Sequence, residues 1–225
     1  MNDRTLDVER VAPPRRRSQE ERRRHTRQAL LDAALIRMDA GEGFDSLSLR
    51  SVTRAAGIAP TAFYRHFASM DELGLALVEE SFRTLRAMLR EAREQPVPRD
   101  IIRRSVEILV EHVRAHHQHF AFVARVRSTG NGVLRQAIRG EVRMFTSELA
   151  TDLARFPVLR EWSTEDLMML AGLLVNTMIA TIEAMLDVPV AAPEAESEIV
   201  RTAEKQLRLT LLAVPHWRSS RQTGP

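Results

Sequence analysis

Apolar residues recur every three or four positions along most of the chain, a spacing that predicts amphipathic helices. Serines followed three positions later by an acidic residue, at 18–21, 69–72 and 163–166, indicate three of the helix starts. Helices are expected over about 18–40, 48–56, 60–67, 70–94, 100–115, 118–127, 132–155, 164–187 and 194–214. Because strand signals are few, the pattern predicts an all-α fold of nine helices: a small N-terminal set and a larger C-terminal bundle.

The segment 44–67 predicts two short helices joined by a tight turn. Ser48 is expected to cap the first helix. Gly57 falls where that helix would end in a left-handed residue, which glycine tolerates without steric cost. Pro60 suits the first turn of the next helix, where its missing N–H would lack a partner anyway. This arrangement is a helix-turn-helix.

The second of these helices has two different faces. At 100° per residue, Phe63 and Phe67 point to one side and would anchor the helix to its neighbours. Thr61 and Arg65 lie on the opposite side, next to Tyr64. A helix with short polar and cationic groups outside fits the major groove of DNA, where phosphates position it and base edges are read. The alternative is a surface helix with an ordinary polar exterior.

Positive charge is concentrated at the N-terminal end. Residues 1–70 carry 13 arginines against 9 acidic residues, whereas residues 71–225 carry 20 basic against 21 acidic ones. Seven of the arginines lie between Arg15 and Arg27. Charge confined to one end indicates a part that binds a polyanion, attached to a nearly neutral body. A high arginine content also follows from GC-rich coding, so charge alone does not establish DNA binding.

Several classes of chemistry are not supported. The chain has no cysteine, which excludes disulfides, thiolate zinc sites and a cysteine nucleophile, and it contains no P-loop, GxSxG or HExxH motif. Four histidines between 112 and 119 are more typical of a solvated helix end or a phosphate contact than of a metal site. The longest uncharged stretch, 167–182, is short for a membrane span and predicts a core helix. We therefore expect a cytoplasmic protein without enzymatic activity, metal or cofactor.

The run Phe44-x-x-x-Ser48-Leu49-x-x-Val52-x-x-x-Ala56-Gly57-Ile58-x-x-x-x-Phe63-Tyr64-x-His66-Phe67-x-Ser69-x-Asp71-Glu72-Leu73 resembles the DNA-binding domain of TetR-family transcriptional regulators. The resemblance implies a homodimer with three N-terminal helices and a ligand-binding bundle. More narrowly, 46–50, 56–67 and 71–75, with Arg125, Arg127, Ser128 and Arg135, resemble the FabR/DesT branch. That branch represses unsaturated fatty acid synthesis and senses acyl thioesters, so unsaturated ones are expected to favour the DNA-bound form and saturated ones to oppose it.

The resemblance also suggests a division of the chain. We expect a flexible arginine-rich arm over 1–17, the helix-turn-helix domain over 18–68, a ligand-binding and dimerisation domain over 69–215 and a tail over 216–225. Many relatives have serine at the position of Ala59 and lysine at those of Ala68 and Met70. Because those lysines lie near phosphates, this chain is expected to rely more on its arm. The alternative is an arm that only improves solubility.

The expected DNA contacts come from the arm and the helix-turn-helix. They are Arg15, Arg16, Arg17, Arg22, Arg23, Ser48, Arg50, Pro60, Thr61, Ala62, Tyr64, Arg65, His66 and Ser69.

The bundle is expected to hold an amphipathic effector, and adaptable methionines suit an acyl chain. The predicted ligand-binding residues are Met88, Phe120, Val123, Arg125, Arg127, Leu134, Ile138, Phe145, Asn176 and Met178. The arginines would meet the phosphates of a thioester carrier, and Asn176 would orient the ligand. Alternatively, the apolar residues simply fill the core and the arginines form surface ion pairs.

The helix over 166–187 is apolar nearly all round, which requires partners on several sides, a twin subunit among them. By resemblance, this helix and the last one form the dimer interface. The predicted interface residues are Leu170, Leu174, Met178, Ile182, Val200, Leu207 and Leu211. A symmetric dimer places its two reading helices about 34 Å apart and so implies a palindromic operator.

The function expected from the sequence is thus a dimeric TetR-type repressor that answers to acyl-CoA or acyl-carrier-protein thioesters and controls unsaturated fatty acid metabolism. A TetR-type repressor of another pathway, such as efflux, with a different amphipathic effector, is the alternative. An all-helical enzyme or lipid carrier is a remote one.

Overall fold

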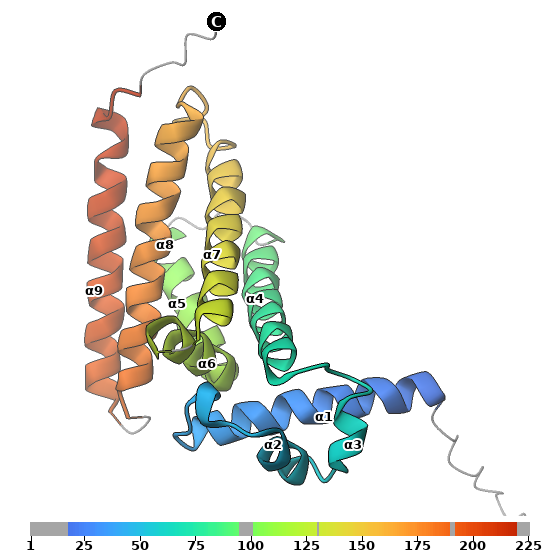
Figure 1. The fold of residues 1–225 in the computed structure, drawn as a ribbon. Coiled ribbons are helices and arrows are strands. Elements are labelled where there is room, and N and C mark those ends of the chain that lie inside the picture. The colour runs from blue at the N-terminus through green and yellow to red at the C-terminus, as the bar shows by residue number, and fades with distance from the viewer. Residues whose placement is uncertain (1–17, 95–100, 130, 190–191, 220–225) are drawn as a thin grey trace, which may run out of the picture.

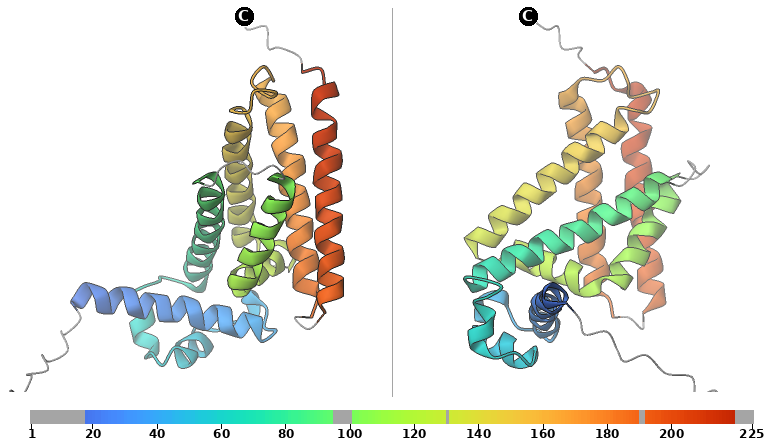
Figure 2. Two further views of the ribbon diagram at one scale, coloured as in Figure 1. Left: turned by 180° about the vertical axis from the view of Figure 1, so that it is seen from behind. Right: turned by 90° about the vertical axis from the view of Figure 1, so that its right-hand side faces the viewer.

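The computed structural model describes residues 18–94, 101–129, 131–189 and 192–219. Within these ranges the chain forms nine α-helices and two short 3-10 segments, and no strand. The elements are α1 Gln19–Asp39, η1 Phe44–Ser46, α2 Leu49–Ala55, α3 Pro60–Phe63, α4 Met70–Glu94, α5 Ile101–Ala115, α6 His117–Thr129, α7 Gly132–Leu153, α8 Thr164–Asp187, α9 Pro193–Leu212 and η2 Val214–His216. The predicted all-α fold is confirmed. Helices α1–α3 form a layer at one end of the α4–α9 bundle, and α1 runs across that end (Figures 1 and 2).

Local capping explains why the helices begin where the sequence predicts. The Ser18 hydroxyl accepts the Glu21 N–H at 3.1 Å, and the Glu21 carboxylate accepts the Ser18 N–H at 2.7 Å. At the start of α4 the Ser69 hydroxyl accepts the Glu72 N–H at 3.2 Å, while the Glu72 carboxylate reaches back to the Ala68 N–H. These bonds pair N–H groups that a helix start otherwise leaves without partners.

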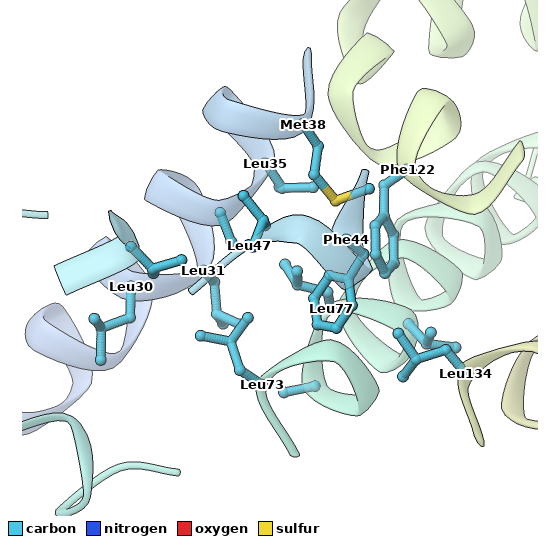
Figure 3. Close-up of a cluster of buried hydrophobic side chains, with 14 of the residues drawn as sticks. Leu30, Leu31, Leu35, Met38, Phe44, Leu47, Leu73, Leu77, Phe122 and Leu134 are labelled. Carbon is cyan, nitrogen blue, oxygen red and sulfur yellow. The ribbon is translucent and has the colours of Figure 1, made fainter. Parts of the chain in front are cut away.

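One hydrophobic cluster joins the N-terminal layer to the bundle. Figure 3 shows this cluster, to which α1 contributes Leu31 and Leu35, η1 Phe44, α4 Leu77 and α6 Phe122. The rings of Phe44 and Phe122 pack edge to face, with their centroids 6.3 Å apart. The N-terminal layer and the adjacent end of the bundle therefore share one continuous core.

Two details of the N-terminal layer differ from the expectation. Its apolar neighbours in the sequence would place Ile36 on the buried face of α1, but its side chain is 57% exposed. Leu31 and Leu35 occupy the buried face instead, because α1 packs against α6 as well as against α2. Helix α3 is also shorter than predicted: it ends at Phe63, and a turn leads to Phe67.

Helix α8 lies between α7 and α9 and packs against both (Figure 1). Judged by length and composition alone, α8 is also long and apolar enough to span a membrane. Its N-terminus is covered by the chain end, because the Ser163 N–H donates to Ser219 Oγ at 2.8 Å and Ser219 donates to Asp166 at 2.5 Å. The beginning of the predicted tail is therefore part of the bundle, and residues 220–225 lie outside the described ranges.

Candidate nucleic-acid interface and apolar cavity

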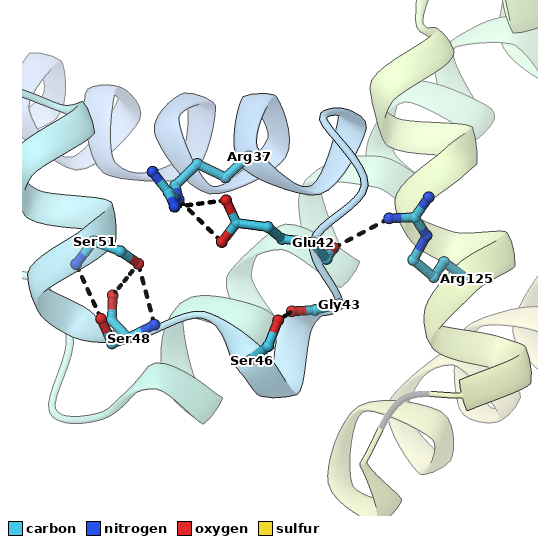
Figure 4. A network of polar contacts seen from close by, with 7 residues as sticks. All are labelled: Arg37, Glu42, Gly43, Ser46, Ser48, Ser51 and Arg125. Carbon is cyan, nitrogen blue, oxygen red and sulfur yellow. Dashed lines mark hydrogen bonds and ion pairs between the residues drawn. The ribbon is translucent and has the colours of Figure 1, made fainter.

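The turn between α2 and α3 is built by local interactions. Ser48 and Ser51 each accept the other's backbone N–H at 3.1 Å and so cap α2 (Figure 4). Gly57 has φ +67°, and a Cβ there would meet no atom within 4 Å. Glycine is therefore required by the left-handed backbone and not by lack of space. Pro60 is the first residue of α3, as predicted.

The short helix α3 rests on two phenylalanines and presents its other side outward. Phe63 and Phe67 are buried, with ring centroids 5.7 Å apart. Thr61 and Arg65 are exposed, and the Tyr64 side chain is 66% exposed. Helices α2 and α3 lie on the side of the N-terminal layer that faces away from the bundle (Figure 1). The exposed side chains are thus free to meet a duplex.

His66 is placed differently from the residues beside it. Its ring is half-buried, and its buried Nδ1 finds no hydrogen-bond partner among the residues that the structure describes. Burial, followed by the charges of three nearby arginines, holds the pKa of His66 below its ordinary value. These arginines are Arg23, Arg27 and Arg65. His66 therefore lies within a cationic corner between α1 and the turn after α3.

Arg27 is a member of this corner that the predicted DNA contacts do not include. Its guanidinium carbon lies 5.1 Å from the centroid of the Phe67 ring, a cation–π contact. Arg23 and Arg27 are one helical turn apart, so both project from the same face of α1 toward the turn after α3. That spacing is the signal in the sequence that would have identified Arg27.

The remaining predicted DNA contacts lie around the helix-turn-helix. Arg22, Ser48, Arg50, Pro60 and Ser69 are exposed, and Ala62 is half-buried. The hydroxyls of Ser48 and Ser69 are already engaged in capping α2 and α4. Arg15, Arg16 and Arg17 lie outside the described residues.

A small apolar cavity of about 60 Å³ lies among α4, α6, α7 and α8. It is lined by Ser81, Phe82, Leu85, His119, Phe120, Val123, Ala124, Arg127, Val142, Phe145, Val175, Met178, Ile179, Ile182 and Glu183. Ser81 Oγ lies 3.0 Å from Nδ1 of His119, and Arg127 is paired with Glu183 at 3.4 Å. Burial is the main cause that lowers the pKa of His119.

The structure brings half of the predicted ligand-binding residues to this cavity. Phe120, Val123, Arg127, Phe145 and Met178 line it.

The other predicted ligand-binding residues are elsewhere. Leu134 and Ile138 belong to the core shared with the N-terminal layer, and Met88 is buried against α5. Asn176 is exposed on α8. Arg125 donates to the backbone carbonyl of Met38 at 2.7 Å and to that of Glu42 at 3.1 Å, the second of which Figure 4 shows. It therefore holds the end of α1 instead of facing a ligand. Sequence reasoning left out Ser81 and His119, whose joint placement depends on how α4 meets α6.

The predicted dimer residues divide into two groups. Leu170 is buried inside the chain, and Met178 and Ile182 are half-buried and line the cavity. Leu174, Val200, Leu207 and Leu211 are half-buried on α8 and α9. The large apolar side chains that are exposed on α8 and α9 do not belong to the predicted set. They are Met169, Leu173, Leu209 and Leu212.

The clustered histidines do not converge on one point. His112 and His116 have ring centroids 6.0 Å apart, and His117 lies 3.4 Å from Asp39. Across the described ranges, no three His, Cys, Asp or Glu side chains are grouped as a metal ion would need.

The fold matches those of solved bacterial regulators. GusR of Salmonella enterica aligns with TM-score 0.65 and 22% identity over 83% of this chain and 95% of its own. A TetR-family transcriptional regulator from Streptomyces coelicolor aligns with TM-score 0.64 and 23% identity over 85% of this chain and 97% of its own. FadR of Bacillus subtilis, solved in complex with stearoyl-CoA, aligns with TM-score 0.60 and 14% identity over 81% of this chain and 96% of its own.

Two family models also match the sequence. Residues 30–77 match the bacterial regulatory proteins of the tetR family, and residues 98–210 match the tetracyclin repressor-like C-terminal domain. TetR regulators bind DNA operators and small-molecule effectors, act as dimers and are not enzymes. The helix-turn-helix, the helical bundle and these two matches together establish that the chain belongs to the TetR family of DNA-binding transcriptional regulators.

Proposed function

We propose that the protein is a homodimeric repressor that binds a palindromic operator in the cytoplasm and releases or retains it according to an effector in the apolar cavity. The observation that carries this proposal is the exposed set Thr61, Tyr64 and Arg65, held outward by the buried Phe63 and Phe67. Thr61 and Arg65 suit base edges in the major groove, and the cationic corner around Arg23 and Arg27 suits phosphates.

The test is footprinting of the DNA upstream of the protein's own gene. Two protected half-sites about one helical turn apart are expected, related by a dyad. Deletion of residues 1–17 should also reduce the salt dependence of affinity, because the arm would contribute arginine–phosphate contacts. Failure to bind any duplex at low salt would contradict the proposal. If the deletion leaves the dependence of affinity on salt unchanged, the arm has only a solubility role.

A second copy of the chain is the proposed partner of α8 and α9. Leu209 and Leu212 are 73% and 69% exposed in the single chain, which is costly for leucines left in water. Met169 and Leu173 are exposed on the adjacent helix α8. A four-helix contact between two copies would cover this surface and position the two reading helices.

An acyl thioester is the proposed effector, and unsaturated fatty acid metabolism is the proposed pathway. Eleven of the fifteen cavity residues are apolar, and the related FadR fold was solved with stearoyl-CoA. Arg127, which is partly exposed at the cavity, would meet a phosphate of the carrier once its contact with Glu183 is broken.

The size of the cavity favours a second candidate. An apolar cavity of about 150 Å³ holds one benzene, whereas this one measures about 60 Å³. A long acyl chain would therefore require the surrounding helices to separate. A compact apolar effector from another pathway would require less movement. Mass spectrometry of ligand that co-purifies with the protein distinguishes an acyl thioester from a compact compound.

Helix α6 would carry the effect of either ligand to the DNA-binding layer. One face of α6 lines the cavity through Phe120 and Val123. On another face, Arg125 holds the carbonyls of Met38 and Glu42 at the end of α1. A shift of α6 on ligand binding would thus move α1. The resulting change in operator affinity is limited to the difference in ligand affinity between the two conformations of the protein, before and after this shift.

A further inference from the structure

The cavity approaches solvent at the seam between α6 and α8. Among the described residues that line it, Arg127 alone is exposed, and the others are buried or half-buried. Arg127 lies on α6 and pairs with Glu183 of α8 at 3.4 Å, and both side chains are 41% exposed. Ile179 and Ile182, the apolar residues that α8 contributes beside Glu183, are only half-buried. One solvent-exposed ion pair therefore lies across the edge of the cavity.

The seam between α4 and α7 is held more firmly. Arg86 of α4 donates to Glu141 at 2.6 Å and to Glu148 at 3.2 Å, and both carboxylates lie on α7. The side chains of Arg86 and Glu141 are each 22% exposed. Leu85 and Val142, which line the cavity, directly follow or precede members of this network in the sequence. Breaking such a shielded network leaves charges uncompensated, so separating α4 from α7 is costly.

Buried apolar side chains hold the other seams around the cavity. Leu77 of α4, Phe122 of α6 and Leu134 of α7 belong to the core shared with the N-terminal layer. Leu153 of α7 and Leu170 of α8 belong to a second buried cluster. A single exposed ion pair contributes little to stability, whereas each buried leucine or phenylalanine that meets water costs free energy. The seam between α6 and α8 is thus the easiest one to separate.

We infer that a ligand enters the cavity between α6 and α8, and that the ion pair of Arg127 with Glu183 is the latch that closes this entrance. The inference rests on the proposed effector role of the cavity and adds the route into it. The closed cavity, about 60 Å³ in volume, is smaller than one that holds a benzene, so a larger ligand requires its walls to separate. Because Arg125 of α6 also holds the end of α1, entry at this seam acts directly on the helix that reaches the DNA-binding layer.

A thiol crosslink tests the route, because the chain has no cysteine of its own. Arg127→Cys/Glu183→Cys places one thiol on each side of the seam, and bismaleimidoethane then joins α6 to α8. The probe is N-phenyl-1-naphthylamine, a neutral fluorophore larger than benzene whose emission rises in apolar surroundings. Stopped-flow fluorescence of the full-length protein without DNA measures its uptake. Each protein is compared with itself before and after the reaction, so a folding defect is not mistaken for a closed entrance.

Uptake should be lost when α6 and α8 are joined. Arg114→Cys/Glu196→Cys is the matched control, because these residues form an ion pair between α5 and α9 and do not line the cavity. Crosslinking this control should leave the rate of uptake unchanged. A block in both crosslinked proteins would mean that general stiffening, and not the α6–α8 seam, limits entry.

A single substitution tests the latch without a crosslink. Glu183→Gln keeps the shape of the side chain but removes its charge, so uptake should become faster by up to about fivefold, the most that an exposed ion pair normally contributes. Glu79→Gln is the matched control, since Glu79 pairs with Arg83 at 2.9 Å on the exposed side of α4 and does not line the cavity. Its rate of uptake should equal that of the wild type.

The outcomes separate the entrance from the effector role. Uptake that persists after α6 and α8 are joined, no uptake by any form of the protein, or equal rates in wild type and Glu183→Gln overturns the inference. If the probe enters at this seam but leaves operator affinity unchanged, the entrance stands and the effector role fails. If the probe still alters operator affinity in the protein with α6 and α8 joined, the effector response stands and the inference fails.

Discussion

Single side chains at the DNA-facing surface have separable roles. Phe63 and Phe67 are buried and hold the reading turn in place, whereas Arg65 is exposed and free to contact bases. Arg27 lies over the Phe67 ring and adds positive charge near the same turn. Changes at exposed residues should therefore alter DNA recognition without altering the fold.

Arg65→Ala should weaken binding to the operator by about 1–3 kcal/mol and leave non-specific binding nearly unchanged, because a lost base contact affects only the specific complex. Fluorescence anisotropy with operator and scrambled duplexes measures both affinities. Arg160→Ala, at an exposed position between α7 and α8, is the control. Equal loss on both duplexes would instead make Arg65 a phosphate contact.

Gly74→Ala should destabilise the protein by about 1–2 kcal/mol, because overpacking outweighs the better helix propensity of alanine. A Cβ at Gly74 would lie 2.6 Å from Phe44 Cζ and 2.8 Å from Leu134 Cδ1, both in the buried core. Gly140→Ala, on the helix α7, is the matched control, since its Cβ would meet nothing within 4 Å. It should be neutral or stabilising in urea unfolding, and a stabilised Gly74→Ala protein would contradict the packing argument.

Two half-buried histidines should make stability depend on pH. Their surroundings lower the pKa of His66 and His119 below the ordinary value of about 6.5, which the unfolded chain retains. The unfolded chain therefore binds more protons below about pH 6.5, and the free energy of unfolding should fall as the pH drops through that region. Urea unfolding at pH 7.5 and 5.5 measures this slope. The double variant His66→Gln/His119→Gln should show a shallower slope than the wild type.

At the scale of elements, α6 has the central position. It contributes to the cavity, to the core shared with Phe44 and to the hydrogen bonds at the end of α1. Local capping begins α2 and α4, and Pro60 begins α3, which is why the sequence predicted where these helices start. Helix α6 also contacts α1, α4 and α8, which are distant in sequence, and there the prediction for Arg125 did not match its place in the structure.

Arg125→Met should loosen the end of α1 while preserving the fold. The substitution keeps an extended apolar side chain but removes the guanidinium that donates to the carbonyls of Met38 and Glu42, of which Met38 retains the N–H of Gly41. Hydrogen exchange should become faster at residues 38–44 and remain unchanged in α8. Arg127→Met, on the same helix, should not affect exchange at 38–44. Equal exchange at residues 38–44 in wild type and Arg125→Met would show that this contact does not secure α1.

For the whole molecule, the exposed leucines of α9 are the main indication that one chain is incomplete. Leu209 and Leu212 lie on a helix that closes one side of the bundle (Figure 1). Two DNA-binding layers held at a fixed distance bind a palindromic operator far more tightly than either layer alone. Assembly and operator affinity should therefore be lost together.

Leu209→Glu combined with Leu173→Glu should convert the dimer to a monomer, because charges on the contact surface would be buried without partners. Size-exclusion chromatography with light scattering measures the mass, and operator affinity should fall in parallel. Val158→Glu is the control, since Val158 is 69% exposed but lies between α7 and α8. A double variant that remains dimeric would move the interface to another surface.

The sequence by itself determined where the helices begin, where they end apart from α3, and which residues form the helix-turn-helix. Caps, left-handed glycine and helix-initiating proline act on neighbours a few residues away, so their signals are local. Only the tertiary structure decided which apolar residues face the cavity, the shared core or a partner. Phe145 and Ile138 lie two turns apart on α7, yet one lines the cavity and the other packs against the N-terminal layer. Helical spacing identifies a buried face, but what covers that face depends on helices brought together from distant parts of the chain.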